Sequence, residues 1–300
     1  MKTYIGIDLG GTNVRVSLVQ PDGTVVQTVK GPSHAHEGAE AVMNNIAAMI
    51  RQISGYEKVS GIGIAVPGPV MPDGSGMAMA TNIPCLEKYP LRDTLQKEFN
   101  IPVILGNDAD AAGLAEAVAG AGKGKRTVVY VTMSTGIGGA IIFDGKLLPG
   151  AHGYSMEVGS MSVDGGRERV HLPGYGAIED WASGTAVTRM GKDAMPDKDV
   201  KHAGIVFDLA QEGYEPAVKI CDQVSTDLAV MFANLATTID PDCFVLGGGM
   251  MKSADVFLPL VEEKFKDRVL PALKDIPFFN ASLEEPGVVG AAMLPISHGL

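Results

Sequence analysis

Short segments rich in apolar residues alternate with turn residues along the first thirty positions, which is the pattern of β-strands joined by turns. Three such segments follow one another: "TYIGIDLG" (3–10), "NVRVSLVQ" (13–20) and "TVVQTVKG" (24–31). The tripeptide "PDG" (21–23) supplies the turn between the second and the third. The chain is therefore predicted to open with three strands joined by turns.

Apolar residues then recur at helical spacing. Residues 39–54 form a predicted helix, a buried-type strand follows at 59–68, and a second helix is expected near 91–99. The apolar run "IPVIL" (101–105) predicts a further strand, which meets an Ala-rich helical pattern at Asp108.

The pattern restarts at residue 127. "TVVYVTMSTG" (127–136) and "GGAIIFDGKLL" (138–148) predict two strands around a glycine-rich turn, and an irregular stretch (149–176) follows. Helices dominate afterwards, the longest at 214–239, before a last long strand, "DCFVLGGGM" (242–250). A β-β-β-α-β-α-β unit thus occurs twice, which predicts an α/β fold with two duplicated domains around a cleft.

The two repeats divide the chain into an N-terminal domain (1–120) and a C-terminal domain (121–286), with glycine-rich linker residues at the boundary. The terminal helix (287–300) carries Gly287 and Gly290 in a pattern that suits close packing. We expect this helix to pack back on the first domain.

Composition narrows the class of protein. The 300 residues are 46% hydrophobic and 20% charged with a net charge of −11, which is typical of a globular protein and argues against a nucleic-acid partner. The chain has only three cysteines and no CxxC pair, so it offers no disulfide framework and fits a reducing compartment. With no secretory leader and no apolar run of about 18 residues, a cytoplasmic protein without a membrane partner is expected.

Three glycine-rich segments each directly follow an apolar strand, where backbone N–H groups can approach a phosphate. One such segment could be a tight hairpin with a left-handed glycine, but three in a duplicated fold favour nucleotide binding. None matches a P-loop or a Rossmann fingerprint. The expected nucleotide-binding residues are Asp8, Gly10, Gly11, Thr12, Asn13, Thr135, Gly136, Gly138, Gly247, Gly248 and Gly249, and Asp8 could hold Mg²⁺ through water.

Asp108 leaves two interpretations open, because it ends an apolar strand and begins a helical pattern. Asp is a preferred helix N-cap, and for the residue taken alone the cap is the favoured interpretation. The alternative is a base that takes a proton from a ligand, since ligands of open α/β sheets gather beyond the carboxyl ends of the strands.

A set of amides and carboxylates is suited to the vicinal hydroxyls of a sugar, because each oxygen can accept a charge-assisted hydrogen bond. Glu157 could instead be a solvated loop residue, and Glu179 a charge that meets a helix dipole. Trp181 is expected to pack rather than to form a sugar platform. The set comprises Asn82, Asn107, Asp108, Glu157 and Glu179.

These segments together resemble the ROK (repressor, open reading frame, kinase) group of sugar kinases, within the actin-like ATPase superfamily. "IDLGGTNVRVSLV" and "STGIGGAII" resemble its two phosphate loops, and "DPDCFVLGGGM" its adenosine-side segment. "GIGIAVPGPV", "ATNIP" and "GNDADAAGLAE" resemble its sugar-side segments, with Asp110 in place of the usual Asn. The resemblance covers essentially the whole chain and implies the actin-like (ribonuclease H-like) fold.

The resemblance also implies an activity: ATP-dependent phosphorylation of a hexose hydroxyl, with glucose to glucose 6-phosphate as the leading case. Asp108 would be the general base, and Mg²⁺ would accompany ATP near Asp8. Gly68 and Ser160 would join the sugar-binding set. A homodimer is expected from the resemblance as well.

The chain departs from the family pattern at one place. Family members usually read "E-x-G-H" followed by a cysteine-containing zinc loop, whereas here Ser160 replaces the histidine and residues 163–179 contain no cysteine. His171 alone cannot make a tetrahedral site, so no structural zinc is expected. Ser160 is shorter and leaves room for a substituent on the sugar.

Other readings stay open. The acceptor could be an N-acetylhexosamine (N-acetylmannosamine or N-acetylglucosamine), allose or a β-glucoside. A sugar-responsive transcriptional repressor shares the fold, but such proteins carry a helix-turn-helix domain before "DLGGT" and this sequence shows none there. A catalytically silent sugar-binding module is a third reading, against which Asp108 and both phosphate loops argue.

Overall fold

The computed structural model describes residues 2–300, which form two compact units. Unit 1 consists of residues 1–130, 140–155 and 281–300, and unit 2 of residues 131–139 and 156–280. The chain therefore passes between the units several times. The division at residue 120 that the sequence suggests stays a prediction.

Unit 1 contains a five-stranded sheet in the order β3-β2-β1-β4-β5. β2 pairs antiparallel with both β1 and β3, whereas β4 is parallel to β1 and β5 is parallel to β4. β1 and β4 are apolar and almost wholly buried, as expected of central strands. The strands are β1 (Tyr4–Leu9), β2 (Asn13–Val19), β3 (Val25–Pro32), β4 (Ile62–Val66) and β5 (Val103–Asn107).

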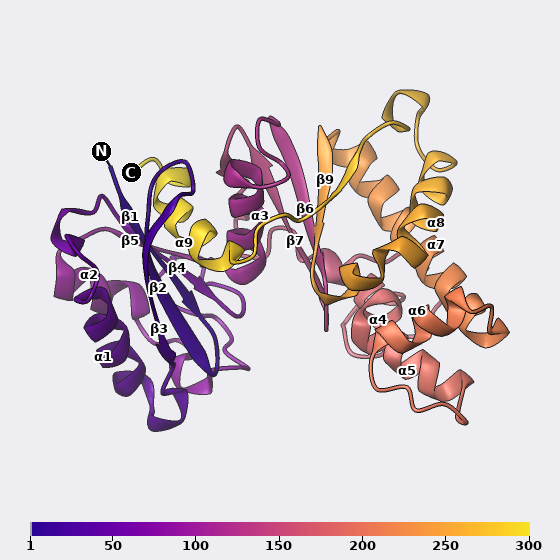
Figure 1. Cartoon of the computed structure of the whole chain (residues 1–300), viewed down its shortest axis with the longest axis horizontal. Helices are drawn as coiled ribbons and strands as arrows, with labels where there is room; N and C mark the ends of the chain where they lie inside the picture. The colour runs from indigo at the N-terminus through magenta and orange to yellow at the C-terminus, as the bar shows by residue number, and fades with distance from the viewer. Residues whose placement is uncertain (1) are drawn as a thin grey trace. The chain divides into compact units, whose positions relative to one another are not determined.

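Helices cover both faces of this sheet (Figure 1). On one side, apolar residues of α1 (Ala39–Ile50) and α2 (Leu91–Phe99) join the strand residues in one hydrophobic core. On the other side, α9 (Pro286–Ser297) packs on β1, β4 and α3 (Asp108–Ala119).

Glycines allow α9 to approach the sheet and α3 at backbone distance. A Cβ atom at Gly63 of β4 would lie 1.7 Å from the Ala291 carbonyl oxygen, and one at Gly290 would lie 1.7 Å from that of Ala111. Side chains at these places would force the elements apart. The glycine pattern of the terminal segment thus has a packing cause.

Glu116 of α3 is a fully buried carboxylate with a complete set of donors. Its two oxygens accept hydrogen bonds from the backbone N–H groups of Ala121 (2.8 Å), Ser282 (2.9 Å) and Leu283 (2.8 Å). A buried charge is tolerated only when it is satisfied in this way. The residue therefore fixes two loops of unit 1 to the end of α3.

The second half repeats the strand order of the first, as β10-β9-β6-β7-β8. β9 and β10 are parallel, like β4 and β5, and β7 pairs antiparallel with β8, like β2 with β3. The duplication predicted from the sequence is thereby confirmed. The strands are β6 (Thr127–Met133), β7 (Ile137–Phe143), β8 (Lys146–Leu147), β9 (Cys243–Gly247) and β10 (Phe278–Asn280).

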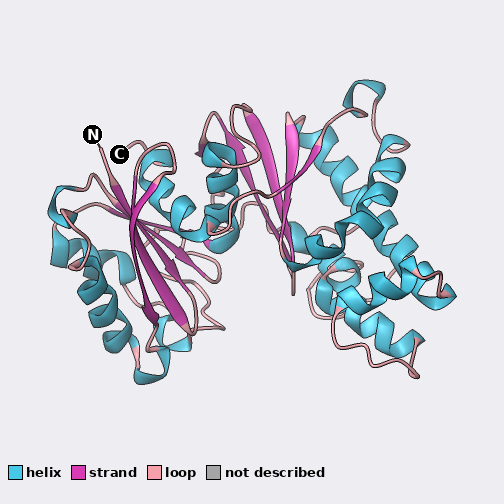
Figure 2. Cartoon of the chain, in the orientation of Figure 1, coloured by secondary structure: helices cyan, strands magenta, loops and turns pink. Residues whose placement is uncertain are grey.

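Helices make up most of unit 2 (Figure 2). They are α4 (Ile178–Ala182), α5 (Gly184–Ala194), α6 (Ala203–Gln211), α7 (Glu215–Ile239) and α8 (Ala254–Lys266). Short 3₁₀ turns complete the chain: η1 (Ala35–Glu37), η2 (Tyr56–Lys58), η3 (Pro84–Leu86), η4 (Val158–Ser160), η5 (Gly249–Ser253) and η6 (Pro271–Leu273).

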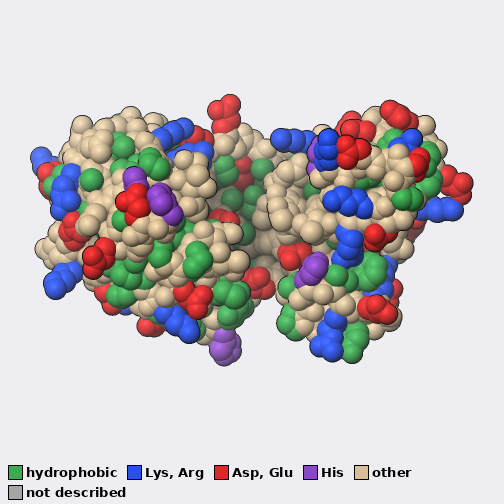
Figure 3. Space-filling view, turned by 90° about the horizontal axis from the view of Figure 1, so that it is seen from below, with side chains coloured by type: hydrophobic (Ala, Val, Ile, Leu, Met, Phe, Trp, Pro, Cys, Tyr) green, Lys and Arg blue, Asp and Glu red, His purple; other side chains and the backbone are tan. Residues whose placement is uncertain are grey.

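The surface carries both signs of charge, with acidic and basic side chains interspersed on the face that Figure 3 shows. Within residues 2–300, none of the helices has the length and apolar character needed to cross a membrane.

Candidate functional site

The start of α3 assigns different tasks to two neighbouring residues. The side chain of Asn107 is the N-cap, because its Oδ1 accepts a hydrogen bond from the backbone N–H of Asp110 at 2.6 Å. Asp108 is the first residue of the helix, and its Oδ1 accepts from the N–H of Ala109 at 2.9 Å. The interpretation of Asp108 as the cap, favoured for the residue alone, is therefore wrong.

The electrostatic surroundings of Asp108 favour its protonated form. Asp108 is exposed by surface area, yet the surrounding protein removes part of the water near its carboxyl, and this desolvation raises its pKa above the ordinary value. The hydrogen bond from Ala109 opposes that rise, and the negative charge of Asp8 adds to it. A carboxyl with a raised pKa is a stronger base once it has lost its proton. Perturbed groups of this kind are frequent at functional sites.

The turn between β1 and β2 brings Asp8 and Arg15 together. Asp8 lies opposite Arg15 in the strand register, and an Arg15 guanidinium nitrogen donates to its Oδ2 at 3.1 Å. Burial raises the pKa of Asp8, and the nearby Arg15 lowers it in part. Glu285 accepts ion pairs from Arg15 (3.7 Å) and from Lys30, which extends the charged network.

The glycines of this turn are needed for close approach. Neither Gly10 nor Gly11 has a positive φ, so the hairpin with a left-handed glycine is not what forms here. A Cβ atom at Gly11 would lie 2.7 Å from the carbonyl oxygen of Asn82. The Gly10–Asn13 turn and the Asn82 loop are therefore in backbone contact, with the side chains of Thr12, Asn13 and Asn82 all exposed.

Gly68, also in unit 1, lies in the loop after β4. Its φ of 147° and the carbonyl of Met79, which a Cβ atom would approach to 2.8 Å, both favour glycine there. The structure thus gives Gly68 a backbone role in shaping this loop.

In unit 2, Glu179 touches the turn between β6 and β7. Its Oε2 accepts a hydrogen bond from the backbone N–H of Ile137 at 2.7 Å. A Cβ atom at Gly136 would lie 2.4 Å from that oxygen, and one at Gly159 would lie 3.0 Å from it. The absence of side chains at both glycines lets the carboxylate reach the turn, so Gly136 and Glu179 are direct neighbours.

Glu157 directly precedes one short turn, η4, and Ser160 is the last residue of that turn. Both residues are exposed, and the N–H of Ser160 donates to the carbonyl of Glu157 at 3.0 Å. Gly159 lies inside this turn, so η4 packs directly against Glu179 and Ile137. Glu157, Ser160 and Glu179 are therefore carried on one connected piece of unit 2.

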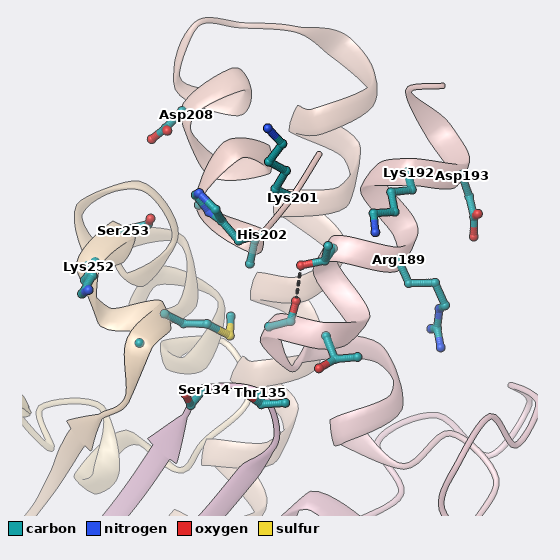
Figure 4. Close-up of a pocket in the computed structure, with 17 residues that line it drawn as sticks. Ser134, Thr135, Arg189, Lys192, Asp193, Lys201, His202, Asp208, Lys252 and Ser253 are labelled. Atoms are coloured by element: carbon teal, nitrogen blue, oxygen red, sulfur yellow. Dashed lines mark hydrogen bonds between the residues drawn. The ribbon is translucent and has the colours of Figure 1, made fainter. Parts of the chain in front are cut away.

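A pocket of about 920 Å³ lies wholly within unit 2. Figure 4 shows Ser134 and Thr135 at its base, beside the ends of two strands, and the basic side chains of Arg189 and Lys192 on α5. Lys201, Lys252 and His202 also line it, together with Gly249. The carboxylates of Asp193 and Asp208 line it as well, so Lys and Arg side chains outnumber carboxylates by four to two. A cavity of this size with an excess of cations is suited to a polyanionic ligand.

Two glycines allow close backbone contacts at this pocket: Gly184 lines it, and Gly248 directly precedes Gly249, which lines it. Gly248 has a φ of 93°, and a Cβ atom there would lie 2.3 Å from the carbonyl oxygen of Met133. A Cβ atom at Gly184 would lie 2.6 Å from the carbonyl oxygen of Ser134, to which the N–H of Gly184 donates at 2.8 Å. The structure thus brings Thr135, Gly248 and Gly249 of the predicted nucleotide set together, with Gly247 at the end of β9 and Gly138 in β7.

Sequence reasoning missed the residues that α5, α6 and η5 contribute to the pocket. Their lysines and histidine belong to no motif, and they lie up to about 120 positions from the "STGIGG" turn. The sequence offered one signal for this part of the pocket, the helix start "SGT" at Ser183. In the structure Ser183 caps α5, because its hydroxyl accepts a hydrogen bond from the N–H of Ala186 at 3.2 Å. The missed residues are Gly184, Thr185, Thr188, Arg189, Lys192, Lys201, His202 and Lys252.

Two carboxylates of unit 1 could hold a metal ion that accompanies phosphate. Mg²⁺ is usually bound by one or two carboxylates plus substrate phosphates, and the negative charge of Asp8 contributes to the raised pKa of Asp108. The stretch 163–179 does not fit tetrahedral zinc, because Cys85, Cys221 and Cys243 lie in other segments. Within residues 2–300, no three His, Cys, Asp or Glu side chains are grouped as metal ligands.

Comparison with known proteins gives one family. The sequence profile of the ROK family matches residues 4–297. A glucokinase of Thermotoga maritima is 32% identical, over 97% of this chain and 96% of its own length. An N-acetylmannosamine kinase of Shigella flexneri is 30% identical, over 97% of this chain and 98% of its own.

Solved structures agree. The ROK hexokinase from Thermus thermophilus superposes with a TM-score of 0.90 at 29% identity, covering 99% of this chain and 100% of that one. The ROK family glucokinase from Streptomyces griseus, in complex with glucose and AMPPNP, gives a TM-score of 0.74 at 27% identity, covering 97% and 98%. Both the sequence and the fold thus match the same family over nearly the whole chain.

Proposed function

We propose that this chain, which belongs to the ROK family and is an ATP-dependent sugar kinase, phosphorylates a hexose. Its leading reaction converts glucose to glucose 6-phosphate. The observation that carries the proposal is the place of Asp108. It begins α3 directly after β5, and Asn107 supplies the cap. The carboxylate of Asp108 is therefore not required at the helix end and is available for a substrate.

In this reaction, Asp108 accepts the proton of the sugar hydroxyl. The hydroxyl oxygen forms a bond to the γ-phosphorus of ATP, and the bond from that phosphorus to the β,γ-bridging oxygen breaks, so that ADP leaves. Positioning and electrostatic stabilisation supply most of the rate in phosphoryl transfer. A raised pKa makes Asp108 a stronger proton acceptor at the moment of transfer.

The nucleotide is assigned to the glycine-rich turns. We assign phosphate oxygens to N–H groups of residues 11–13 and to those near Thr135, Gly136 and Gly138. The N–H of Gly10 instead donates to the carbonyl of Asn13 at 2.9 Å and closes the turn. The pocket of unit 2, with Gly249 in its wall and Gly248 directly before it, is the proposed nucleoside site. Mg²⁺ held near Asp8 would offset negative charge on the phosphates.

The sugar is assigned to the amides and carboxylates predicted from the sequence. Asn107 can donate through its Nδ2 while its Oδ1 caps the helix, and Glu179 retains Oε1 beside the oxygen that binds Ile137. Hydrogen bonds of this kind discriminate strongly between hydroxyl patterns. The proposed contacts are Gly68, Asn82, Asn107, Asp108, Glu157, Ser160 and Glu179.

N-acetylmannosamine is the second candidate acceptor. A kinase for this sugar is among the relatives at 30% identity, and Ser160 is smaller than the histidine of the family motif. The exposed position of Ser160 on η4 leaves room for an N-acetyl substituent.

The test is ADP release from Mg-ATP with a panel of sugars: glucose, mannose, allose, methyl β-glucoside, N-acetylglucosamine and N-acetylmannosamine. The highest kcat/KM is expected with glucose, and two-dimensional ³¹P–¹H NMR of the product should correlate phosphorus with the protons on C6. A kcat/KM about tenfold higher with N-acetylmannosamine, about 1.4 kcal/mol in transition-state binding, would replace glucose as the substrate. ADP release that no sugar increases would contradict the proposal.

A further inference from the structure

The loop that runs from η4 into the first residue of α4, residues 161–178, is closed at its base by two backbone hydrogen bonds. The N–H of Val163 donates to the carbonyl of Gly176 at 3.0 Å, and the N–H of Ile178 donates to that of Met161 at 2.8 Å. The residues between them form no helix or strand. This loop directly connects Ser160, on one side, with Glu179, on the other.

A buried ion pair ties the loop to the long helix α7. Arg167 donates two hydrogen bonds to the carboxylate of Asp227, from Nη1 to Oδ2 at 2.5 Å and from Nη2 to Oδ1 at 2.9 Å. The Asp227 side chain is only 4% exposed and that of Arg167 17%. Gln223 donates a third bond to Asp227 at 3.0 Å. A bidentate pair in such surroundings fixes direction as well as distance.

A second carboxylate holds the far side of the loop. Asp180 of α4 is buried, and it accepts hydrogen bonds from the consecutive backbone N–H groups of Val170, His171 and Leu172 at 3.1–3.3 Å. Asp180 is the immediate neighbour of Glu179. The backbone of the loop is thus fixed to the same turn of helix that carries a proposed sugar ligand.

The only tryptophan of the chain reports on this arrangement. The guanidinium groups of Arg167 and Arg189 lie 5.1 and 5.6 Å from the centre of the Trp181 ring. Arg189 also donates to the carbonyl of Asp180 at 2.6 Å. Any displacement of Arg167 would therefore change the surroundings of Trp181, whose fluorescence can be measured without a substrate.

We propose that Arg167, Asp227 and Asp180 are positioning residues for the sugar site: they hold loop 161–178 so that Ser160 and Glu179 keep their places. In this chain an ion pair and a backbone-binding carboxylate cross-link a loop that has no cysteine for a metal. Sugar affinity therefore depends on charges that themselves do not touch the sugar. The inference rests on the proposed function, because it takes Ser160 and Glu179 as sugar ligands.

The physical reason for a large effect is that neither charge can be removed singly at low cost. Asp227→Asn leaves the Arg167 guanidinium beside a neutral amide in a poorly hydrated place, with only the half-exposed Asp164 carboxylate, at 3.2 Å, as its anion. Arg167→Gln leaves the Asp227 carboxylate without its cation. Replacing both at once restores a neutral hydrogen-bonding pair. The double variant should therefore be closer to the wild type than either single variant.

The test compares Asp227→Asn, Arg167→Gln and the double variant with Asp222→Asn as the matched control. Asp222 lies on the same helix and forms an ion pair with Lys264 at 2.8 Å, on a contact that does not involve the loop. Measured quantities are the sugar KM, the ATP KM and kcat of the full-length protein, and the Trp181 emission maximum without ligands.

We expect each single variant to raise the sugar KM by roughly tenfold, to leave the ATP KM and kcat within about twofold, and to shift Trp181 emission to longer wavelength. Asp222→Asn should match the wild type, and the double variant should recover part of the sugar affinity. Unchanged sugar KM and unchanged emission in Asp227→Asn would overturn the proposal, as would a parallel rise of both KM values.

Two further comparisons keep the result interpretable. If Asp227→Asn does not fold, Arg167→Lys takes its place, because a lysine keeps the charge but cannot bind both carboxylate oxygens; the same two readouts then decide. If the wild type phosphorylates no sugar, the proposed function fails, while the emission shift still shows whether the ion pair orders the loop.

Discussion

At the residue scale, two adjacent polar residues at the start of α3 have different roles: Asn107 caps the helix, and Asp108 is the proposed general base. Asn107 completes the helix end, and Asp108 follows it with a carboxyl whose pKa is raised by desolvation and by Asp8. An Asp in this position would ordinarily be assigned to the cap. Here the cap is already present one residue earlier, so the carboxylate can serve a substrate.

Variants of Asn107 separate its two tasks. Asn107→Ser keeps a capping oxygen but loses the amide N–H groups, whereas Asn107→Ala loses both. We expect Asn107→Ala to lower the free energy of unfolding by about 1 kcal/mol and Asn107→Ser to lower it by much less, while both raise the sugar KM. Urea unfolding and steady-state kinetics measure these effects. Equal loss of stability in the two variants would count against the cap.

The raised pKa of Asp108 predicts a pH-dependent gain of stability on its removal. The folded protein holds this proton more tightly than the unfolded chain, so the contribution of the group is complete below the unfolded pKa and is lost as pH rises through the folded pKa. Asp108→Asn never ionises and should therefore have a higher Tm than the wild type at about pH 7, with the difference shrinking towards about pH 4. A lower Tm at neutral pH would contradict the direction of the shift.

At the element scale, glycines decide how closely turns and helices approach. Gly248 is the clearest case, since a left-handed φ and the Met133 carbonyl both exclude a side chain. Gly248→Ala should raise the ATP KM by roughly tenfold with little change in the sugar KM, because strain of about 1–3 kcal/mol has to be relieved by moving the next residue, Gly249, which lines the pocket.

Gly213→Ala is the matched control for that variant. Gly213 has a φ of 81°, but nothing lies within 4 Å of the place of its Cβ atom, and it does not line the pocket. Both variants carry a backbone strain, and only Gly248→Ala should change ATP binding. A similar ATP KM in the two would show that the turn after β9 does not shape the nucleotide site.

The contact of α9 with α3 gives a stability prediction. An alanine at Gly290 would place its Cβ atom 1.7 Å from the Ala111 carbonyl, whereas Gly165 has open space and an ordinary φ. We expect Gly290→Ala to cost about 1–3 kcal/mol or more of unfolding free energy, and Gly165→Ala to be within about 0.5 kcal/mol of the wild type. Denaturant unfolding of the three proteins gives the comparison, and equal midpoints would refute the packing argument.

The strands and long helices could be predicted from the sequence because their periodicity is local. β4 and β9 are continuous apolar runs, β1 is interrupted only by Asp8, and α7 keeps one apolar face over 25 residues. The cap at Asn107 could not be separated from Asp108 by pattern alone, since both residue types are good caps. The choice depends on where β5 ends, and boundaries are what periodicity defines least well.

At the scale of the whole molecule, the repeated strand order follows from the repeated pattern, whereas the pocket of unit 2 does not. Lys192, His202 and Lys252 meet at one cavity only because α5, α6 and η5 pack together in unit 2. None of them belongs to a motif. Arg167 and Asp227 likewise belong to no motif: they are 60 positions apart in the sequence and form an ion pair only in the folded chain.

The kinase reaction itself is tested most directly by sugar-dependent ADP release from Mg-ATP, measured for the wild type, Asp108→Asn and Asp110→Asn. Asp110→Asn is the matched control, because it removes a charge from the same helical turn and introduces the residue usual in the family. The account predicts a fall in kcat of about 10²–10⁴-fold for Asp108→Asn, with the sugar KM little changed, and a rate within about twofold of the wild type for Asp110→Asn. Substantial turnover by Asp108→Asn would contradict its role as the general base.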